Sequence, residues 1–540
     1  MGMIPRRVTV PDQEVAPTKV PYRNLAAIAS HDDGVNLNFT YEFRSDVDGT
    51  NVYVKKREGI TILSSLASAS TQVGRGIFSW RKSSATTDTL LYALDDTTDT
   101  KIYTDSSGTG SAAKTLTGIT GKNIYYVPVS AFDGTTTTEK LFIFNTGVTQ
   151  IYDGSTFSNA TATPLQTASL GIFYRNMLVA VTTGNANRIN FSDVGKPDTF
   201  TTGNALDFPS AITGLYVYEN SLLVFTRNSI YTVIGSQPNE IVLSGSTRGM
   251  LQKGVPAGTD SHRSIARVGD WVYFWNRDRI FRYNTVDLQE VAYPKLQKTL
   301  GTVVKTSSSS FAGIGFNGRY YLAVVYSTGT TNNAVLVYDP RADDLGRPID
   351  EYVLHTSPWV ASFTTYRSGV NSVPQLVFDT NSATSRKEKA YIYNGSTTPL
   401  DNVTASSTST ITFQYTTQFL DHGDGHFIKK VRYVFFRTKG IGVTATSQLK
   451  IGVDFGGFTT VLNWMMDSGG FILDEGGTSG AGILDTTAVT DASYSITDVK
   501  RLQLPDSRSV ALQFYDVQQA GQTELYDFDL QLVPKKLKTK

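Results

Sequence analysis

The stretch Trp271-Val272-Tyr273-Phe274-Trp275 decides the predicted fold, because it is apolar on both faces. In an extended strand successive side chains point to opposite faces, so its three largest rings lie on one face and the other two residues on the opposite face. Such a strand must be covered on both sides. A polar turn, Asn276-Arg277-Asp278, and a second strand around Ile280-Phe281 follow it. This pattern predicts a β-hairpin buried between two neighbouring layers.

The same two-strand pattern recurs through the middle of the chain. Its second strand carries an aliphatic–aromatic core at Ile102-Tyr103, Ile151-Tyr152, Ile189-Asn190-Phe191, Ile230-Tyr231, Ile280-Phe281, Leu336-Val337-Tyr338 and Tyr391-Ile392-Tyr393. Successive markers lie roughly 40 to 55 residues apart, which is the period of β-propeller blades. We therefore predict an all-β protein with a central β-propeller of six or seven blades.

The two ends of the chain have different patterns. Residues 1–35 contain prolines and charges without periodicity, which predicts an extended N-terminal arm, and the propeller is predicted over residues 36–404. From 405 to 540 apolar and polar residues alternate, as in 430–436 and 526–532. This alternation predicts an antiparallel β-sandwich with one solvated face. Its basic tail, from Pro534 to Lys540, is either solvated or in contact with phosphate or an acidic partner surface.

Composition excludes several classes of protein. The chain has 49 Lys and Arg against 48 Asp and Glu, and a net charge of +1 argues against a dedicated duplex DNA binder. The absence of cysteine excludes disulfides, thiolate zinc sites and a cysteine nucleophile, and it suits synthesis in a reducing cytoplasm. The first residues lack the apolar core of a signal peptide, and we expect no membrane span.

Two short motifs resemble known functional motifs but are better explained as turns. Gly313-Ile-Gly315-Phe-Asn-Gly318 matches the dinucleotide fingerprint, which requires a helix after it. Because the strand Tyr320–Val325 follows instead, we expect a hairpin turn. Ser192-Asp193-Val-Gly195 resembles the Asp-box of sialidase propellers, but the spacing differs and the motif occurs once. A local turn stabilised by its own polar groups explains it better.

The densest cluster of metal-ligating residues is His422-Gly-Asp424-Gly-His426. Positions i, i+2 and i+4 of a strand share a face, so a metal site is geometrically possible there. The two glycines favour a polar turn instead. We therefore predict no catalytic, cofactor-binding or metal-binding residue, and no enzyme activity.

A resemblance to a known family begins at Asn187–Phe200. A strand ending in Phe191-Ser192-Asp193 and followed by Gly-x-Pro resembles the tail hub or nozzle proteins of short-tailed bacteriophages, also called stabilisation or tubular proteins. Further similar segments lie at 51–59, 74–76, 212–231 and 421–431. Glu58 departs from the pattern, which has proline at that position.

The resemblance implies an architectural role in genome ejection. Such proteins form a homohexameric ring below the portal and its adaptor, the head–tail connector protein, and they continue the DNA channel and hold tail fibres or spikes. The implied location is the virion tail after synthesis in the host cytoplasm, with only transient, non-specific contact with passing DNA. A propeller and a sandwich also offer the rigid, non-identical faces that a closed ring needs.

Two other functions stay open at this stage. The paired aromatics Tyr125-Tyr126 and Tyr320-Tyr321 would serve a carbohydrate-binding propeller adhesin if their rings were exposed. A propeller glycoside hydrolase would require two carboxylates in one cleft, about 5 to 9.5 Å apart.

Overall fold

The computed structural model of the chain is built almost wholly of β-strands. The residues it describes are 18–22, 25, 43–48, 51–64, 72–96, 98–105, 111–238, 240–243, 257–291, 296–341, 351–356, 358–369, 372–381, 390–396, 400–404, 407–420, 428–441, 445–454, 457–467, 470–474, 482–483, 495–498, 507–516 and 522–535. Within these ranges there are one short α-helix, α1 (Gln297–Thr302), and three 3-10 turns, η1 (Thr163–Gln166), η2 (His262–Ser264) and η3 (Lys305–Ser310). No helix among the described residues has the length and apolar character needed to cross a membrane.

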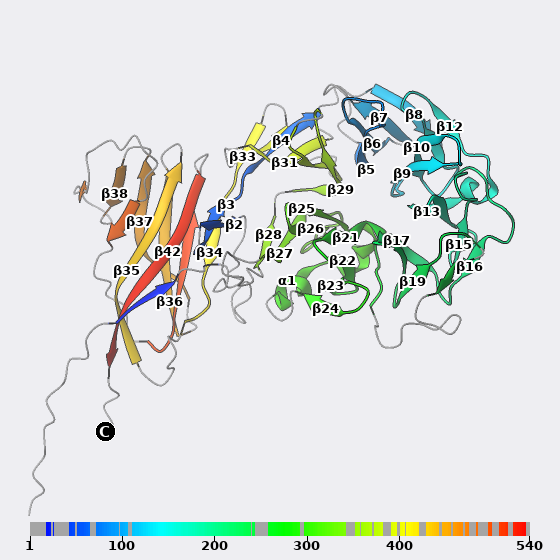
Figure 1. Cartoon of the computed structure of the whole chain (residues 1–540). Helices are drawn as coiled ribbons and strands as arrows, with labels where there is room; N and C mark the ends of the chain where they lie inside the picture. The colour runs from blue at the N-terminus through cyan, green and yellow to red at the C-terminus, as the bar shows by residue number, and fades with distance from the viewer. Residues whose placement is uncertain are drawn as a thin grey trace, which may run out of the picture.

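Seven four-stranded antiparallel sheets follow one another around a common axis (Figure 1). The first strands of neighbouring sheets contact one another, except that β17 of the fourth sheet contacts the turn η2 that precedes the fifth sheet; the first sheet meets the last, so the ring is closed. In chain order the first six sheets are β5 (Val73–Trp80), β6 (Thr89–Asp95), β7 (Thr100–Asp105), β8 (Ser111–Leu116); β9 (Tyr125–Phe132), β10 (Thr137–Phe144), β11 (Gln150–Tyr152), β12 (Phe157–Asn159); β13 (Ala168–Tyr174), β14 (Met177–Thr182), β15 (Arg188–Phe191), β16 (Ala205–Asp207); β17 (Ile212–Tyr218), β18 (Ser221–Thr226), β19 (Ile230–Ile234), β20 (Val242–Leu243); β21 (Ala266–Val268), β22 (Trp271–Asn276), β23 (Arg279–Tyr283), β24 (Leu288–Val291); and β25 (Ala312–Phe316), β26 (Arg319–Val324), β27 (Ala334–Asp339), β28 (Glu351–His355).

The seventh sheet is assembled from two distant parts of the chain. Its first three strands are β29 (Val360–Tyr366), β30 (Gln375–Thr380) and β31 (Ala390–Ser396), and its outermost strand is β4 (Gly59–Ser64), which pairs antiparallel with β31. A strand from before the first sheet therefore completes the last one. This pairing closes the ring by backbone hydrogen bonds rather than by side-chain packing alone.

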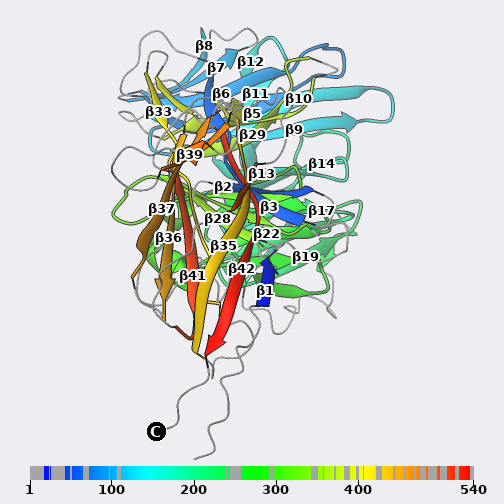
Figure 2. The same cartoon turned by 90° about the vertical axis from the view of Figure 1, so that its left-hand side faces the viewer.

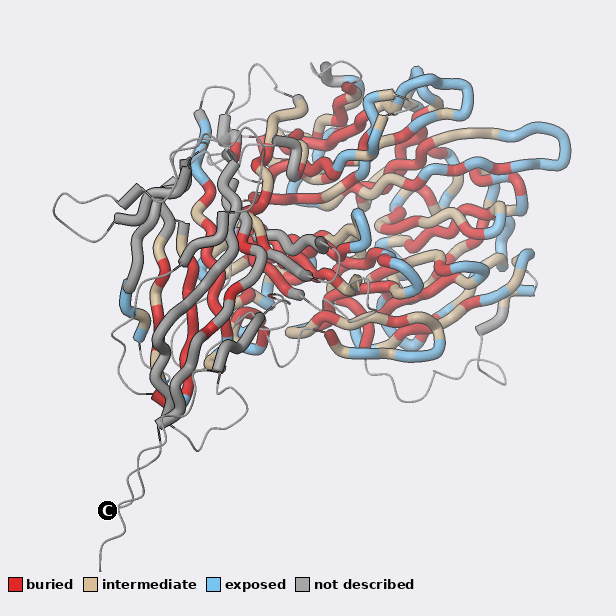
Figure 3. The backbone as a smooth tube through the Cα atoms, turned by 60° about the vertical axis from the view of Figure 1, so that its left-hand side comes forward, coloured by how far each residue is buried: buried red, intermediate tan, exposed pale blue. Residues whose placement is uncertain are grey.

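The all-β fold class and the β-propeller are confirmed. Each of the seven aliphatic–aromatic markers lies in the third strand of one sheet: β7, β11, β15, β19, β23, β27 and β31. The stretch from Trp271 to Trp275 is β22, and it is covered on both faces as predicted. Tyr273 stacks on Tyr320 of the sixth sheet at 5.2 Å, whereas Phe274 meets Phe225 of the fourth sheet edge to face, also at 5.2 Å. Figure 3 shows the buried strand centres and the exposed turns at the ends of the hairpins.

Two six-stranded antiparallel sheets form a second body beside the propeller (Figure 1). Figure 2 shows this body from the front, with the propeller behind it. Phe514 and Phe528, one from each sheet, lie 6.2 Å apart, so the apolar faces of the sheets meet. The short hairpin of β32 (Leu400–Thr404) and β33 (Ser407–Thr410) precedes this body. One sheet of the second body contains β1 (Thr18–Tyr22), β2 (Phe43–Asp48), β3 (Asn51–Lys56), β42 (Gln522–Lys535), β35 (Ile428–Ile441) and β40 (Ser495–Asp498). The other sheet contains β34 (Gln414–Thr416), β41 (Val510–Asp516), β36 (Ala445–Val453), β37 (Thr459–Asp467), β38 (Gly470–Asp474) and β39 (Gly482–Ile483).

The predicted boundaries at the N-terminal side need correction. The predicted arm 1–35 contains β1, which pairs with β42, and residues 1–17 and 26–42 lie outside the described part of the chain. The predicted propeller range, from 36 to 404, begins with β2 and β3, which belong to the sheet of β42 and not to a blade. The reason is that alternation identifies a strand but not its partner, and here the partner is more than 450 residues away.

A buried ion pair holds the junction between the two bodies. The chain passes from β3 into β4 through Arg57, and the Arg57 guanidinium binds the Asp401 carboxylate of β32 through two bonds, Nη1–Oδ1 at 2.8 Å and Nη2–Oδ2 at 2.7 Å. Both side chains are 0% exposed. The Ile60 amide of β4 also donates to Asp401 Oδ1 at 3.1 Å. The chain therefore enters the propeller at the place where the C-terminal part leaves it.

One apolar core extends through both bodies. It joins Val360 and Phe378 of the seventh propeller sheet to Phe413, Phe514 and Leu530 of the second body. Because the two bodies share buried side chains, bending between them would expose apolar surface to water.

Glycines let the inner strands approach one another closely, and one of them gives a test. A Cβ on Gly315 of β25 would lie 2.0 Å from the carbonyl oxygen of Arg267 in β21. Gly315→Ala should therefore push the fifth and sixth sheets apart and lower the free energy of unfolding by about 1–3 kcal/mol. The control is Gly301→Ala in α1, where the added methyl group meets open space. Chemical denaturation of both variants checks this, and equal stabilities would contradict it.

Candidate functional site on the propeller axis

The dinucleotide-like motif is a hairpin turn, as predicted. Gly313 and Gly315 lie in β25, and the chain turns at Asn317 and Gly318, whose φ angles are +47° and +75°. Strand β26 follows directly and pairs with β25. No helix N-terminus is present at this turn to hold a pyrophosphate, so the motif has a packing role.

The motif at residues 192–195 is also a structural turn. The Asp193 carboxylate accepts hydrogen bonds from the Thr201 hydroxyl at 3.0 Å and the Asn204 amide at 3.1 Å. Gly195 has a φ of +75°, and a Cβ there would lie 2.4 Å from the carbonyl oxygen of Phe132 in the preceding sheet. The turn thus packs the third sheet against the second.

The remaining candidates are only partly described. His422, Asp424 and His426 lie outside the described residues, as does the tail from 536, whereas Pro534 and Lys535 end strand β42. Within the described ranges no group of three or more His, Asp or Glu side chains is placed to hold a metal ion. The metal site at 422–426 therefore stays an untested alternative.

The two tyrosine pairs differ in exposure. Tyr320 and Tyr321 are 0% and 3% exposed, so their rings pack inside the blades. Tyr125 and Tyr126, at the start of β9, are half-buried and line a cavity on the propeller axis. Only the second pair presents ring surface that a ligand could reach.

Two β-bulges lie near the propeller axis, where the first and last blades meet. The register of β5 shifts between Gly74 and Gly76, and that of β29 shifts between Val360 and Ser362, which leaves Arg75 and Ala361 as the extra residues. A bulge breaks the regular ladder and redirects the local backbone groups. Here the carbonyl oxygens of the extra residues become acceptors for a side chain from another blade.

That side chain is Arg263, carried by the 3-10 turn η2 between the fourth and fifth sheets. Its Nη1 donates to the Ala361 carbonyl at 3.3 Å, and its Nη2 donates to the carbonyls of Ile124, at 3.1 Å, and of Arg75. The guanidinium also lies over the Tyr125 ring, with Cζ 5.3 Å from the ring centre. One side chain thereby ties the inner strands of the first, second and seventh sheets together.

Asp379, at the end of β30, completes this arrangement from the outer side. Its Oδ1 accepts from the Ser362 amide and hydroxyl, each at 2.7 Å, and its Oδ2 accepts from the Gly76 amide at 2.9 Å. The peptide units preceding Gly76 and Ser362 therefore accept from Arg263 on one side and donate to Asp379 on the other. The two opposite charges are bridged by two backbone peptides, and we call these two residues and two peptides the axial latch.

Burial sets the proton affinities around the latch. Desolvation raises the pKa of Asp379 above its usual value, although the Arg263 charge and the hydrogen bonds from Ser362 and Gly76 oppose this shift. Desolvation also lowers the pKa of Arg263. The same desolvation, together with the neighbouring Arg263 charge, lowers the pKa of His262 to about 4. His262 Nδ1 consequently acts as an acceptor, for the Leu215 amide at 3.2 Å.

His262 provides a direct test of this environment. An NMR titration of the five histidines should give His262 a pKa of about 4, well below the ordinary value of roughly 6.5. Because the pKa of His262 is lower in the folded protein than in the unfolded chain, the unfolded chain binds a proton at a higher pH. The contribution of His262 to stability is therefore present above pH 6.5 and is lost as the pH falls toward 4. A His262 pKa near 6.5 would show that the axis is open to water.

The cavity beside the latch has a volume of about 560 Å³. It is lined by side chains from the inner strands of six sheets and from η2. Six Phe and Tyr rings contribute to its largely apolar wall, and those of Phe78 and Tyr126 stack at 5.7 Å with an interplanar angle of 12°. Of its lining residues only Arg263 carries a charge at neutral pH. This combination of rings and one cation makes the cavity the candidate functional site.

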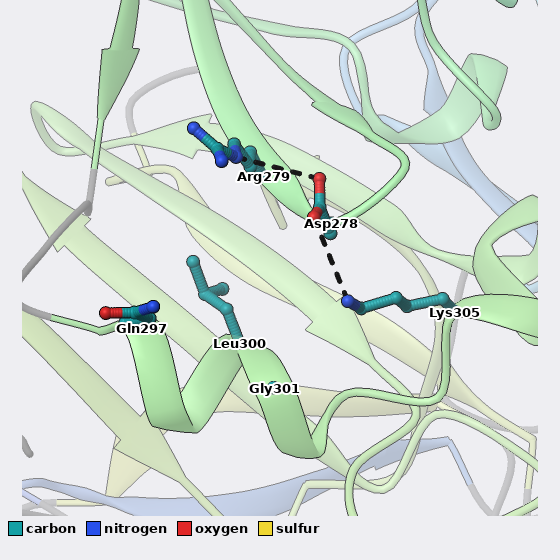
Figure 4. A pocket seen from close by; sticks show the side chains of 6 residues that line it. All are labelled: Asp278, Arg279, Gln297, Leu300, Gly301 and Lys305. Atoms are coloured by element: carbon teal, nitrogen blue, oxygen red, sulfur yellow. Dashed lines mark ion pairs between the residues drawn. The ribbon is translucent and has the colours of Figure 1, made fainter. Parts of the chain in front are cut away.

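A second hollow, of about 260 Å³, lies between the fifth sheet and α1 (Figure 4). Asp278 stands between two cations, with Oδ1 3.8 Å from Arg279 Nε and Oδ2 3.9 Å from Lys305 Nζ. Arg279 also pairs with Glu290 at 2.6 Å. All four side chains of this network are at least a quarter exposed, so solvent screens their charges and they form an ordinary surface network.

Sequence reasoning did not find the latch or the cavity. Arg263 lies in a polar loop, and the local pattern gives no indication that it reaches the axis. The sequence does contain a signal that Asp379 is buried, because it directly follows three consecutive apolar strand residues, Leu376–Phe378, which are buried on both faces of β30. A carboxylate in that position has to be buried with partners.

Comparison with known proteins adds little to this description. No family model matches the chain, and no curated protein matches it. Solved structures with some similarity include the N-terminal domain of Nup159, at 12% identity and a TM-score of 0.36, with coverage of 67% of this chain and 98% of that chain. Another is a chain of the S. cerevisiae complex of Dbp5 with Nup159 and Gle1, at 11% identity and a TM-score of 0.36, with coverage of 65% of this chain and 97% of that chain. A third is the extracellular domain of the putative one-component system BT4673 from B. thetaiotaomicron, at 12% identity and a TM-score of 0.37, with coverage of 81% of this chain and 47% of that chain. Similarities this weak carry no argument about function.

Proposed function

We propose that the protein is a structural subunit of a bacteriophage tail, which assembles into a homohexameric ring below the portal and adaptor. The ring would continue the DNA ejection channel and anchor fibres or spikes. This proposal rests on the resemblance of residues 51–59, 74–76, 187–200, 212–231 and 421–431 to tail nozzle proteins. The structural observation that supports it best is the buried connection between the propeller and the second body.

A ring subunit that bears load should not bend between its parts. Here the chain crosses between the two bodies in both directions, and the crossing point is held by the buried Arg57–Asp401 pair. The apolar core also continues across the junction. A two-domain enzyme that closes on a substrate would need a hinge at this place, whereas a scaffold benefits from its absence.

The propeller axis does not suit DNA passage. The Arg263 side chain occupies it and is bonded to carbonyl oxygens of three different inner strands. A cavity of about 560 Å³ is also far too small for a duplex. In the proposed ring the channel therefore lies between subunits, and the near-zero net charge of the chain would let DNA slide without tight binding.

The proposal is tested by assembly of the full chain. Mass measurement by light scattering and electron microscopy of the purified protein, alone and mixed with the adaptor of its own phage, should show a discrete sixfold ring. Labelling of intact virions with an antibody against the chain should mark the tail. A strictly monomeric protein that is absent from particles would overturn the proposal.

A carbohydrate-binding function is the second candidate, and one observation favours it. Tyr125 and Tyr126 are half-buried at the axial cavity, where a pyranose ring could stack on them. A glycan array probed with the full chain tests this function. An array without any specific signal would remove it.

A further inference from the structure

The axial cavity has more accessible ring surface than a packed propeller core requires. Eight of its apolar lining residues are half-buried rather than buried: Phe78, Tyr125, Tyr126, Ile172, Phe173, Tyr216, Val217 and Phe363. They come from the inner strands of five different sheets. Side chains in the strands behind them are almost completely buried, so the incomplete burial is confined to the axis. A flat apolar group placed there would remove ring surface from water.

The wall of the cavity is electrostatically positive on one side. An arginine guanidinium has five N–H groups, and three of those on Arg263 donate to backbone carbonyls. The other two have no protein acceptor in the described part of the chain. The balancing carboxylate, Asp379, is 0% exposed and lies behind the peptide units of the latch, outside the cavity lining. A ligand in the cavity would therefore face the cation and not the anion.

The other polar groups of the lining are already engaged. The Ser362 hydroxyl donates to Asp379 Oδ1 and accepts from the Ile77 amide at 2.8 Å. His262 uses Nδ1 to accept from the Leu215 amide. A ligand with many hydroxyl groups, such as the sugar of the second candidate function, would lose water here and find few partners in exchange, which counts against that candidate. One charged group on an otherwise apolar body fits the lining better.

We propose that the axial cavity is a binding site for an organic anion that carries one carboxylate on a flat apolar body. The carboxylate accepts from a free N–H group of Arg263, and the apolar body packs against the stacked rings of Phe78 and Tyr126. The site is independent of ring assembly, because every residue in it belongs to one subunit.

The test uses 3-phenylpropionate as the probe and the full chain as the protein. Isothermal titration calorimetry should detect 1:1 binding, and the neutral isostere 3-phenylpropanamide should bind about tenfold more weakly, because it lacks the charge-assisted bond to Arg263. Glucuronate, which has the carboxylate but a hydroxylated body, should bind weakly or not at all. Equal binding of the acid and the amide, stronger binding of glucuronate, or no binding of 3-phenylpropionate would each overturn the proposal.

Two tryptophan variants locate the site. Val217→Trp fills the cavity and should reduce 3-phenylpropionate affinity at least tenfold. The matched control, Val286→Trp, adds the same ring at a position that is 80% exposed in the turn between β23 and β24 and should leave the affinity unchanged. If Val217→Trp does not fold, Phe78→Leu keeps apolar bulk but removes the stacking ring, and it should weaken binding severalfold. Unchanged affinity in a folded cavity variant, or equal loss in the control, contradicts the location.

Discussion

Replacing Asp401 with alanine is expected to lower the free energy of unfolding by about 3–5 kcal/mol. The substitution leaves the Arg57 guanidinium at 0% exposure without the carboxylate that now binds it through two short bonds. A buried charge that loses its counter-ion is among the most costly changes in a protein interior. Urea denaturation followed by circular dichroism measures the effect.

The matched control is an ion pair of the same chemistry on the surface. Arg188 and Asp207 also form two bonds, at 2.5 and 2.7 Å, but their side chains are 41% and 58% exposed. Asp207→Ala should leave the unfolding curve nearly unchanged, because water replaces the lost partner. If Asp401→Ala behaved like Asp207→Ala, the junction would be solvated and the two bodies would not be rigidly joined.

A second comparison separates the charge from the packing. Arg57→Met combined with Asp401→Leu removes both charges and retains apolar volume, so it should recover much of the stability lost in Asp401→Ala. A double variant that is less stable than Asp401→Ala would show that the polar bonds themselves, including the one from the Ile60 amide, hold the junction.

The sequence was sufficient to predict the blades because six of the seven are local units and the seventh has three local strands. The markers at Ile102, Ile151 and the five later positions repeat with the blade period, and each hairpin joins strands a few residues apart. Burial on both faces of β22 was likewise readable from five consecutive residues. Propeller architecture is thus encoded by local patterns that repeat.

The closing elements could not be predicted in the same way. Strand β4 is apolar and alternating like many others, and nothing in residues 59–64 indicates that the partner is β31, more than 300 residues away. The same holds for β1 and β3 against β42. The axial latch combines side chains from η2 and β30 with two bulged strands. Such contacts arise only after the ring has closed, so the sequence carries no short-range pattern for them.

Arg263→Met is expected to lower the free energy of unfolding by about 2–4 kcal/mol at neutral pH, because three carbonyl acceptors lose their donor and Asp379 loses its facing charge. The pH dependence gives the decisive readout. The pKa of Asp379 is raised in the folded protein, so its contribution to stability is fully present below the unfolded value of roughly 3.8 and is lost as the pH rises through the folded value. Removing the Arg263 charge raises the pKa of Asp379 further. The stability difference between wild type and Arg263→Met should therefore be smaller near pH 4, where only the loss of the three carbonyl bonds contributes, and grow toward pH 7.

A double-mutant cycle tests whether the two peptides really couple the charges. Asp379→Asn keeps an acceptor for Ser362 but removes the charge, and by itself it should also destabilise, because its amide group cannot accept from the Gly76 amide. Once Asp379 is neutral, the Arg263→Met substitution no longer leaves an uncompensated buried anion. The double variant should therefore lose clearly less stability than the sum of the single losses, and its Arg263-dependent pH effect should disappear. If the two stability losses were strictly additive and the pH profile were unchanged, Arg263 and Asp379 would act separately. The bulged peptides of β5 and β29 would then transmit no charge interaction where the first and seventh sheets meet.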